Sequence, residues 1–223
     1  MNKINKNMTE LKYLGKALLN VLFPEKCPLC GEILSKENRS SNRHICMACH
    51  GKINYYDNGT GARSLSLLKH DEAAKKIIYN LKFNNKRDNA AFLADEVVSE
   101  FGDKIKALNP DVIVPVPLHK KRLRERGFNQ AELIGRKIAE MLSLPFESSL
   151  LIRQKKTIPQ MKLNPFERKK NLENAFSADG TKYYETVLLI DDIYTTGSTV
   201  EECRKALLRQ SAGSVFYLTM SRV

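Results

Sequence analysis

One segment, residues 187–199, limits the possible folds more than any other part of the chain. It begins with four apolar residues, Val187 to Ile190, continues with Asp191 and Asp192, and leads into a Thr-Thr-Gly-Ser-Thr sequence. An uninterrupted apolar run is typical of a strand buried on both faces, as in a parallel sheet covered by helices. Ser198 and Glu201 have the spacing of a helix capping box. The segment therefore predicts a strand, a loop and a helix of an α/β fold.

The predicted loop has the chemistry of an anion site. Backbone N–H groups, hydroxyls and a helix N-terminus can surround a phosphate, and Gly197 permits a close turn. Asp191 and Asp192, expected to end the strand, could accept hydrogen bonds from vicinal hydroxyls beside that phosphate. The pattern therefore indicates a sugar-phosphate site. The simpler alternative is a solvated turn in which Thr and Ser only cap the helix.

Two cysteine pairs near the N-terminus predict a metal site. Each has the form C-x₂-C, and fifteen residues separate them, as in four-cysteine zinc sites. The ligands would be Cys27, Cys30, Cys46 and Cys49. Because thiolates would fill all four positions, the zinc would be structural, and its binding would supply folding free energy that this short polar segment lacks. The alternatives are disulfides, which are uncommon without export, and a redox-active dithiol.

Three nearby or leftover side chains have simpler interpretations. His44 and His50 flank the second pair and could replace a ligand, although we expect them to be bystanders. Cys203, the fifth cysteine, lies in the predicted helix after the loop and is expected to be a small core residue.

The chain of 223 residues is long enough for one α/β domain and a small module. We expect an N-terminal helix and zinc module over 1–54, a polar linker over 55–63 and the α/β domain over 64–223. An amphipathic stretch from Leu11 to Phe23 is interpreted as a packing helix, with a membrane-surface or partner-binding helix as the alternative. No apolar run approaches the ~20 residues that span a membrane, and no secretory signal is evident, so a cytoplasmic location is expected.

Strand-like and helix-like patterns alternate along the rest of the chain. Helical spacing covers residues 73–81, about 89–101 and 133–142, and strand-like runs occupy 112–114 and 215–218. Proline at 115 and 117 predicts that the first of these strands ends early, with a loop after Val114. The alternation favours a parallel sheet.

Positive charge is concentrated in two segments. The net charge is +12 and the sequence pI is about 9.5, which suggests an acidic partner. The two clusters lie in residues 120–126 and 155–170, beside the predicted phosphate site. Phe128 follows the first cluster and could either stack on a base or anchor the loop in the core. Basic runs are often only solvated surface, but single-stranded DNA is the expected partner. The candidate nucleic-acid contacts are Lys120, Lys121, Arg124, Lys155 and Lys156.

The 187–199 segment resembles the phosphoribosyl pyrophosphate (PRPP) motif of type I phosphoribosyltransferases, with its apolar residues, acidic pair and Thr/Gly/Ser-rich loop. The resemblance implies their parallel sheet flanked by helices. It implies that Asp191 and Asp192 hold the ribose hydroxyls and that Mg²⁺ accompanies PRPP. The 5-phosphate loop would comprise Thr195, Thr196, Gly197, Ser198 and Thr199.

The order of motifs is similar to that of the ComF family of bacterial competence proteins. The cysteine pairs come first, followed by Pro115-Val116-Pro117 and Arg126-Gly-Phe-Asn-Gln130, then by residues 157–171 and the PRPP motif. The resemblance implies a zinc module ahead of a phosphoribosyltransferase domain and a link to the uptake of transforming DNA. Arg122 and Arg126 to Gln130 would line the diphosphate side, and Thr157 to Leu163 would form a mobile loop over the site.

The leading hypothesis is therefore a PRPP-binding ComF-like protein that acts in natural transformation. It would handle imported single-stranded DNA, and proteins of the competence machinery are possible partners. Phosphoribosyltransferase activity is left open, because no motif identifies an acceptor base. One alternative is a nucleobase-salvage phosphoribosyltransferase, for which a zinc module is unnecessary. The other is a non-catalytic nucleic-acid-binding adaptor, which the zinc module and basic runs favour.

Overall fold

The computed structural model describes residues 24–42, 44–59, 64–154 and 172–223. Its centre is a four-stranded sheet in the order β1-β6-β5-β2, with every neighbouring pair parallel. The strands are β1 (Ser64–Lys69), β2 (Val112–Pro115), β5 (Tyr184–Tyr194) and β6 (Ala212–Arg222). The described residues thus have the predicted parallel sheet.

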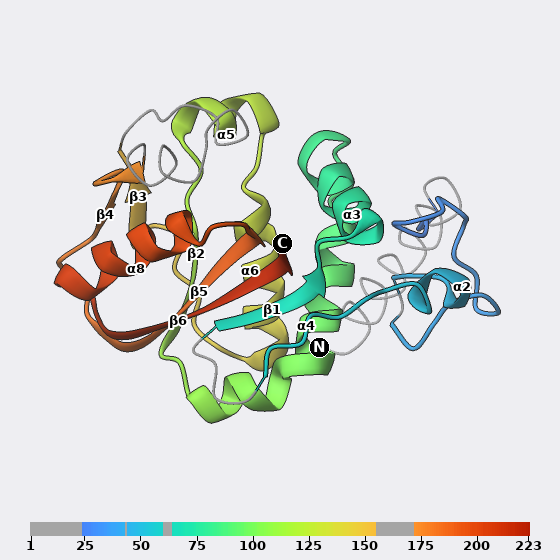
Figure 1. The fold of residues 1–223 in the computed structure, drawn as a ribbon, viewed down its shortest axis with the longest axis horizontal. Coiled ribbons are helices and arrows are strands. Elements are labelled where there is room, and N and C mark those ends of the chain that lie inside the picture. Colours follow the sequence, from blue (N-terminus) through green and yellow to red (C-terminus); the bar gives the residue numbers. More distant parts are fainter. Residues whose placement is uncertain (1–23, 43, 60–63, 155–171) are drawn as a thin grey trace, which may run out of the picture.

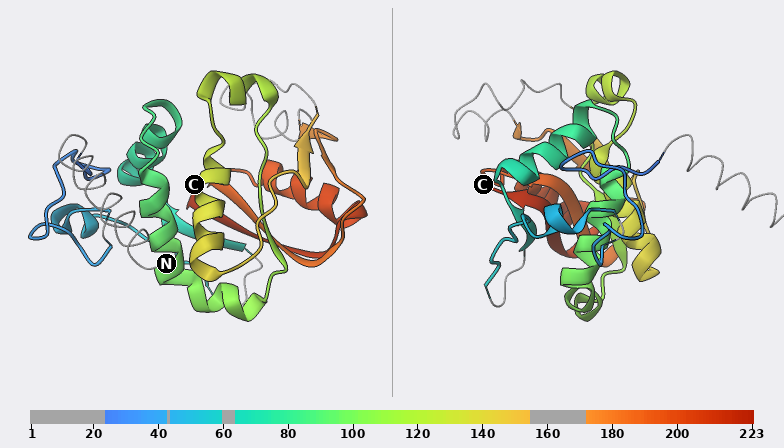
Figure 2. Two further views of the ribbon diagram at one scale, coloured as in Figure 1. Left: turned by 180° about the vertical axis from the view of Figure 1, so that it is seen from behind. Right: turned by 90° about the vertical axis from the view of Figure 1, so that its right-hand side faces the viewer.

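Helices cover both faces of the sheet (Figures 1 and 2). One face packs against α3 (Glu72–Phe83), α4 (Asn89–Leu108) and α6 (Gln130–Leu142). The other packs against α8 (Ser198–Gln210) and a small antiparallel pair, β3 (Leu151–Arg153) and β4 (Phe176–Ala178). This layering explains the apolar run in β5, because Leu188 and Ile190 face the first set of helices and Val187 and Leu189 face α8.

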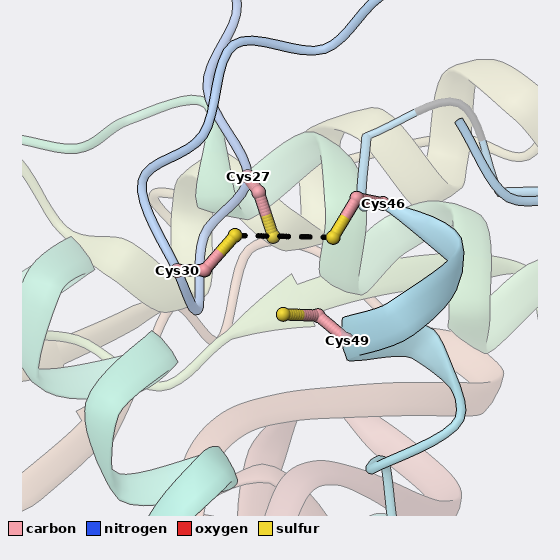
Figure 3. A group of neighbouring side chains, drawn as sticks. All are labelled: Cys27, Cys30, Cys46 and Cys49. Carbon is pink, nitrogen blue, oxygen red and sulfur yellow. Dashed lines mark hydrogen bonds between the residues drawn. The ribbon is translucent and has the colours of Figure 1, made fainter. Parts of the chain in front are cut away.

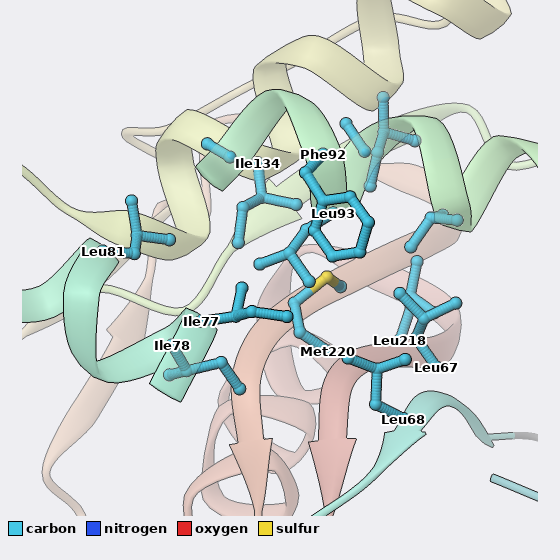
Figure 4. Close-up of a cluster of buried hydrophobic side chains, with 14 of the residues drawn as sticks. Leu67, Leu68, Ile77, Ile78, Leu81, Phe92, Leu93, Ile134, Leu218 and Met220 are labelled. Atoms are coloured by element: carbon cyan, nitrogen blue, oxygen red, sulfur yellow. The ribbon is translucent and has the colours of Figure 1, made fainter. Parts of the chain in front are cut away.

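The larger core lies between the sheet and three helices (Figure 4). Ile77 and Leu81 of α3, Phe92 of α4 and Ile134 of α6 are fully buried there against Leu218 of β6. Full burial of such side chains contributes about 1.5–3 kcal/mol each. The predicted helical spacings are confirmed at these positions, since the apolar residues three and four apart do face the core.

Several predicted boundaries differ from those in the structure. Strand β5 runs to Tyr194, so the acidic pair lies within the strand instead of ending it, because β6 supplies pairing partners up to Arg222. Helix α4 continues to Leu108, where Asn109 in the left-handed region ends it. Strand β2 includes Pro115, at the edge of the sheet where a missing N–H costs little. Strand β1 was not predicted at all.

The predicted linker is also partly paired. Tyr56 N donates to Leu67 O at 2.9 Å, and the Asn58 side chain bonds both backbone groups of Ser66. Residues 55–59 therefore line the outer edge of β1. The amphipathic stretch 11–23 lies outside the described residues. Among the described helices, none is long and apolar enough to cross a membrane.

The cysteine-containing module lies at the end of the molecule opposite α8 (blue in Figures 1 and 2). It includes the one-turn helix α2 (Met47–His50). Ile45 is fully buried in the same core cluster as Phe92 of α4. The Asn42 amide donates to Phe92 O at 3.3 Å and also to the Glu96 carboxylate. The module is thus packed directly on α4.

Candidate functional site

The acidic pair lies near the carboxyl end of β5, where ligands of parallel α/β sheets bind. Successive strand residues point to opposite faces, so Asp191 and Asp192 have different surroundings. Asp192 is 6% exposed, and its backbone N–H donates to the Asp191 carboxylate at 2.8 Å. Burial, followed by the adjacent Asp192 charge, raises the pKa of Asp191 to about 7.

Two side chains from distant parts of the chain hold Asp192. Lys82 Nζ of α3 lies 2.9 Å from Asp192 Oδ1, and Gln130 Nε2 at the start of α6 donates to Asp192 Oδ2. Arg126 Nη1 in turn donates to Gln130 Oε1 at 2.5 Å. This network joins α5, α6, β5 and α3 around one carboxylate. Neither Lys82 nor Gln130 was predicted to bind it, because 110 and 62 residues separate them from Asp192 in sequence.

Each residue from Arg126 to Gln130 has a structural role. Gly127 ends α5 (Lys120–Arg126) with φ of 77°, and Asn129 caps α6 by accepting from Ala131 N at 3.1 Å. Phe128 is 8% exposed beneath the Arg87 guanidinium, so the core-anchor interpretation holds and the base-stacking one does not. Together these features direct Gln130 and Arg126 toward Asp192.

The basic run 120–126 is a helix, α5, where a loop was expected. The His119 side chain caps it by accepting from Lys121 N at 3.2 Å. Lys120, Lys121 and Arg124 are exposed, whereas Arg122 and Arg126 are partly buried. Burial lowers the pKa of Arg126, and the nearby Asp192 charge opposes that effect. The helix therefore presents three cations to solvent, and Arg126, one of the two partly buried cations, lies near Asp192. Lys155, Lys156 and the predicted covering loop 157–163 lie outside the described residues.

Arg153 of β3 is a further cation near the acidic pair that sequence reasoning missed. It is 8% exposed, and its guanidinium lies 5.3 Å from the Phe176 ring centroid. Burial lowers its pKa, as does the charge of Arg122, while Asp191 has the opposite influence. Cations from α3, α5 and β3 thus surround the two carboxylates.

The predicted phosphate loop turns tightly at Gly197. Gly197 has φ of 74° and precedes α8 as its N-cap, so Ser198 is the first helical residue and the expected capping box is wrong. Thr195 and Thr196 are exposed, and the Thr196 and Ser198 hydroxyls lie 2.9 Å apart. Thr199 follows in the first turn of α8. The loop thus places hydroxyl groups beside the N-terminal end of α8, where backbone N–H groups can bind an anion.

Two aromatic side chains, Tyr194 and Tyr217, lie beside the loop at Gly197. The Tyr194 ring is parallel to the Tyr217 ring at 5.8 Å, and the Arg222 guanidinium lies 4.4 Å from the Tyr194 centroid. A Cβ atom at Gly197 would overlap the Tyr194 ring. A shallow pocket of about 250 Å³ opens here, lined by Tyr194, Thr196, Gly197, Ser198, Glu201, Glu202, Lys205 and Tyr217.

The four predicted metal ligands lie together (Figure 3). All four sulfur atoms are within 4.8 Å of one another, and those of Cys30 and Cys46 are 3.8 Å apart. Sulfurs bound to one tetrahedral zinc at about 2.3 Å would be about 3.8 Å apart. At Cys27, burial is outweighed by hydrogen bonds from the backbone of Cys46, Cys30 and Leu29, which lower its pKa to about 7, whereas burial raises the pKa of Cys46 and Cys49. A metal is thus indicated by the positions of the four sulfurs. The cluster therefore fits a four-thiolate zinc ion.

The two flanking histidines contact α4 instead of the cysteine cluster. His50 Nε2 lies 3.2 Å from Glu96 Oε1, and His44 Nε2 lies 3.5 Å from Asp95 Oδ2. Glu96 is 3% exposed and also accepts a hydrogen bond from Tyr55. The histidines are thus bystanders to the metal site, as expected, and they attach the module to the sheet domain. Cys203 is fully buried, which confirms its interpretation as a core residue.

No protein-family model matches the chain. Competence protein ComFC of Bacillus subtilis is 30% identical over an alignment of 223 positions, which covers 94% of this chain and 83% of that protein. DNA utilization protein YhgH of Salmonella typhi is 33% identical over 156 residues, 69% of each chain. Competence protein F of Haemophilus influenzae is 41% identical over 101 residues, 44% of each chain.

Solved structures show more distant similarities. The glutamine PRPP amidotransferase of B. subtilis superposes with a TM-score of 0.42 at 17% identity, covering 64% of this chain and 30% of that one. The adenine phosphoribosyltransferase of Leishmania tarentolae has a TM-score of 0.41 at 15% identity, covering 74% of this chain and 93% of that one.

Proposed function

The chain belongs to the ComF family of competence proteins, and from this premise we propose that it binds PRPP with Mg²⁺ at the carboxyl end of β5. We propose further that it acts in natural transformation, in the cytoplasmic handling of single-stranded DNA. The family assignment rests on the 30% identity to B. subtilis ComFC across 94% of the chain. PRPP as the ligand is a separate step that rests on the site.

The observation that supports PRPP most directly is the pairing of two carboxylates with a phosphate loop on one strand end. Asp191 and Asp192 supply acceptors suited to ribose hydroxyls, and the turn at Gly197 exposes N–H groups and hydroxyls suited to the 5-phosphate. Arg122 and Arg126 of α5 offer planar cations suited to a diphosphate. PRPP carries a phosphate at one end of its ribose and a diphosphate at the other. The loop, the acidic pair and the arginines would bind the phosphate, the ribose and the diphosphate, respectively.

The chemistry open to such a site is displacement of diphosphate from the ribose carbon. A bond would form between an acceptor atom and that carbon while the carbon–oxygen bond breaks, and the diphosphate would leave with the electron pair. Arg122 and Arg126 would stabilise the charge that gathers on the leaving group. The acidic pair would hold the ribose in position, so no protein nucleophile is required. Mg²⁺ on the diphosphate would neutralise part of its charge.

The engagement of Asp192 by Lys82 and Gln130 favours a second candidate, the non-catalytic adaptor. A carboxylate already bound at 2.9 Å by a lysine is not freely offered to a ribose hydroxyl. In that case the site would sense or bind an anion without turnover. Release of diphosphate in the presence of PRPP and an acceptor separates the two candidates, and turnover of free purines or pyrimidines would instead favour salvage.

We also propose that the cysteine cluster holds one structural zinc ion. Cys27, Cys30, Cys46 and Cys49 would be its complete ligand set, which leaves no open position for catalysis. Zinc would fix the two C-x₂-C turns, and the contacts of Asn42 and His50 with Glu96 would hold the module on α4.

Gene replacement tests the proposed role in transformation. The chain, produced in B. subtilis in place of its own ComFC, is expected to support transformation. The variant carrying Asp191→Ala and Asp192→Ala is expected to fail at an equal protein level. Equal transformation frequencies for wild type and variant would contradict a role for PRPP. Failure of both proteins, each present and folded, would contradict the role in transformation.

A further inference from the structure

Helix α3 exposes two aromatic rings where a helix of this kind would normally present polar side chains. Tyr79 and Phe83 are 57% and 60% exposed, one turn apart, with ring centroids separated by 4.8 Å. The opposite side of the same helix is fully packed, with Ile77 and Leu81 inaccessible to solvent. The aromatic pair therefore makes no contribution to the core, and its exposure calls for another explanation.

The chain segment that carries the pair is strongly positive. From Ala73 to Arg87 the chain carries five cations and no carboxylate. Four of them are exposed: Lys75, Lys76, Lys86 and Arg87. The fifth is Lys82, whose ammonium pairs with Asp192. A partner for this surface must therefore combine negative charge with flat apolar groups.

Helix α5 extends the same surface. The Arg126 guanidinium lies 5.1 Å from the centroid of the Phe83 ring, so the C-terminal ends of α3 and α5 are in contact. Lys120, Lys121 and Arg124 are exposed on α5. In Figure 1 α5 (yellow-green) lies beyond the end of α3 (teal). Exposed aromatic rings thus lie between two cationic segments.

We infer that Tyr79 and Phe83 form a stacking platform for single-stranded nucleic acid, with phosphates bound by the cations of α3 and α5. Bases of a single strand have accessible faces that can stack on these rings, whereas bases of a duplex do not. Apolar protein partners do not need the four exposed cations, and an acidic peptide does not need the exposed rings. The inference rests on the proposed handling of single-stranded DNA and identifies the surface that would carry it.

The platform adjoins the acidic pair. Lys82 lies next to Phe83 in sequence and pairs with Asp192, while Arg126 contacts both Phe83 and Gln130. A strand lying on α3 would therefore reach the rim of the site at the end of β5. Nucleic acid and a sugar-phosphate ligand would approach the protein from the same side.

Fluorescence anisotropy with a labelled oligothymidine of about 20 nucleotides tests the platform in the full-length protein. The Tyr79→Ala, Phe83→Ala double variant is expected to bind at least tenfold more weakly than wild type at low salt, with the salt dependence little changed. Lys75→Gln combined with Lys86→Gln should weaken binding and reduce the salt slope. Tyr79→Phe should retain affinity, because the ring remains.

Tyr183→Ala is the matched control, because Tyr183 is also exposed, at 65%, but lies just before β5, away from α3 and α5 in sequence. It should leave affinity unchanged. Unaltered binding by the double aromatic variant would overturn the platform while sparing the proposed DNA handling. An equal loss for duplex DNA would overturn the stacking argument. If wild type did not bind the oligonucleotide, both the platform and the proposed DNA handling would be overturned. PRPP affinity is measured separately, and Tyr79→Ala should leave it unchanged.

Discussion

Lys82 Nζ lies 2.9 Å from Asp192 Oδ1, although 110 residues separate them in sequence. The pair joins the C-terminal turn of α3 to the carboxyl end of β5. Both side chains are largely buried, at 17% and 9% exposure. Since a buried charge without a partner is costly, each side chain keeps the other in place.

Lys82→Met should therefore destabilise the fold by about 3 kcal/mol, because it leaves the Asp192 charge buried without its cation. Adding Asp192→Asn should recover much of that loss. Urea unfolding measures both effects. Lys75→Met, on the exposed side of the same helix, should stay within about 0.5 kcal/mol of wild type. An equally small effect for Lys82→Met would show that the ion pair contributes nothing.

The raised pKa of Asp191 predicts a pH-dependent stability. Because its folded-state pKa is about 7 instead of 3.8, ionisation costs stability as pH rises from about 4 through 7. Asp191→Asn removes that cost, so the Tm of the variant relative to wild type should increase between pH 5 and pH 8. Asp179→Asn is the control: its pKa is lowered from 3.8, so its titration lies below this window. A constant difference for Asp191→Asn would contradict the burial argument.

Gly197→Ala should destabilise the loop before α8, since φ of 74° is unfavourable for alanine and its Cβ would overlap the Tyr194 ring. We expect a loss of at least about 1 kcal/mol in thermal or urea unfolding. Gly51→Ala offers a comparison, because Gly51 has φ of −62° and a Cβ there would meet only Met47 O, at 3.8 Å. If both substitutions behaved alike, the strain attributed to Gly197 would be wrong.

Purified protein should contain one zinc ion per chain by elemental analysis. Cys27→Ser should lose the metal and unfold the module, because zinc closes this local loop, while the α/β domain remains folded. His50→Ala should keep the metal, since His50 contacts Glu96 on α4 instead of the cysteine cluster. Well under one zinc per wild-type chain, or disulfides between these cysteines, would defeat the assignment.

Local sequence patterns were sufficient for the strand β5, whose apolar run reports burial on both faces. For β1, Ser64 and Ser66 alternate with Leu65 and Leu67, which is the pattern of a strand with one exposed face, and this strand was overlooked. Ser66 is nevertheless fully buried, because its hydroxyl pairs with Thr219 on β6 at 2.8 Å, a contact that no nearby residue signals. Strand β1 depends on β6, which follows about 150 residues later.

In the candidate site, too, local sequence patterns predicted some residues and missed others. The acidic pair, the loop and the cysteines stand out because each is compact in sequence. Lys82, Gln130 and Arg153 did not stand out as partners of the acidic pair, because only the folded sheet brings α3, α6 and β3 to one strand end. Helix α5 was missed because its residues are almost all charged and show no apolar periodicity.

Calorimetric titration with PRPP in the presence of Mg²⁺ tests the central proposal most directly. Wild type should bind, and Asp191→Ala and Asp192→Ala should each weaken binding roughly 10- to 150-fold, equivalent to about 1.5–3 kcal/mol for hydrogen bonds to charged groups. Circular dichroism should show that the variants remain folded. Equal affinity for wild type and the folded double variant, or no binding by wild type, would contradict a PRPP site at the end of β5.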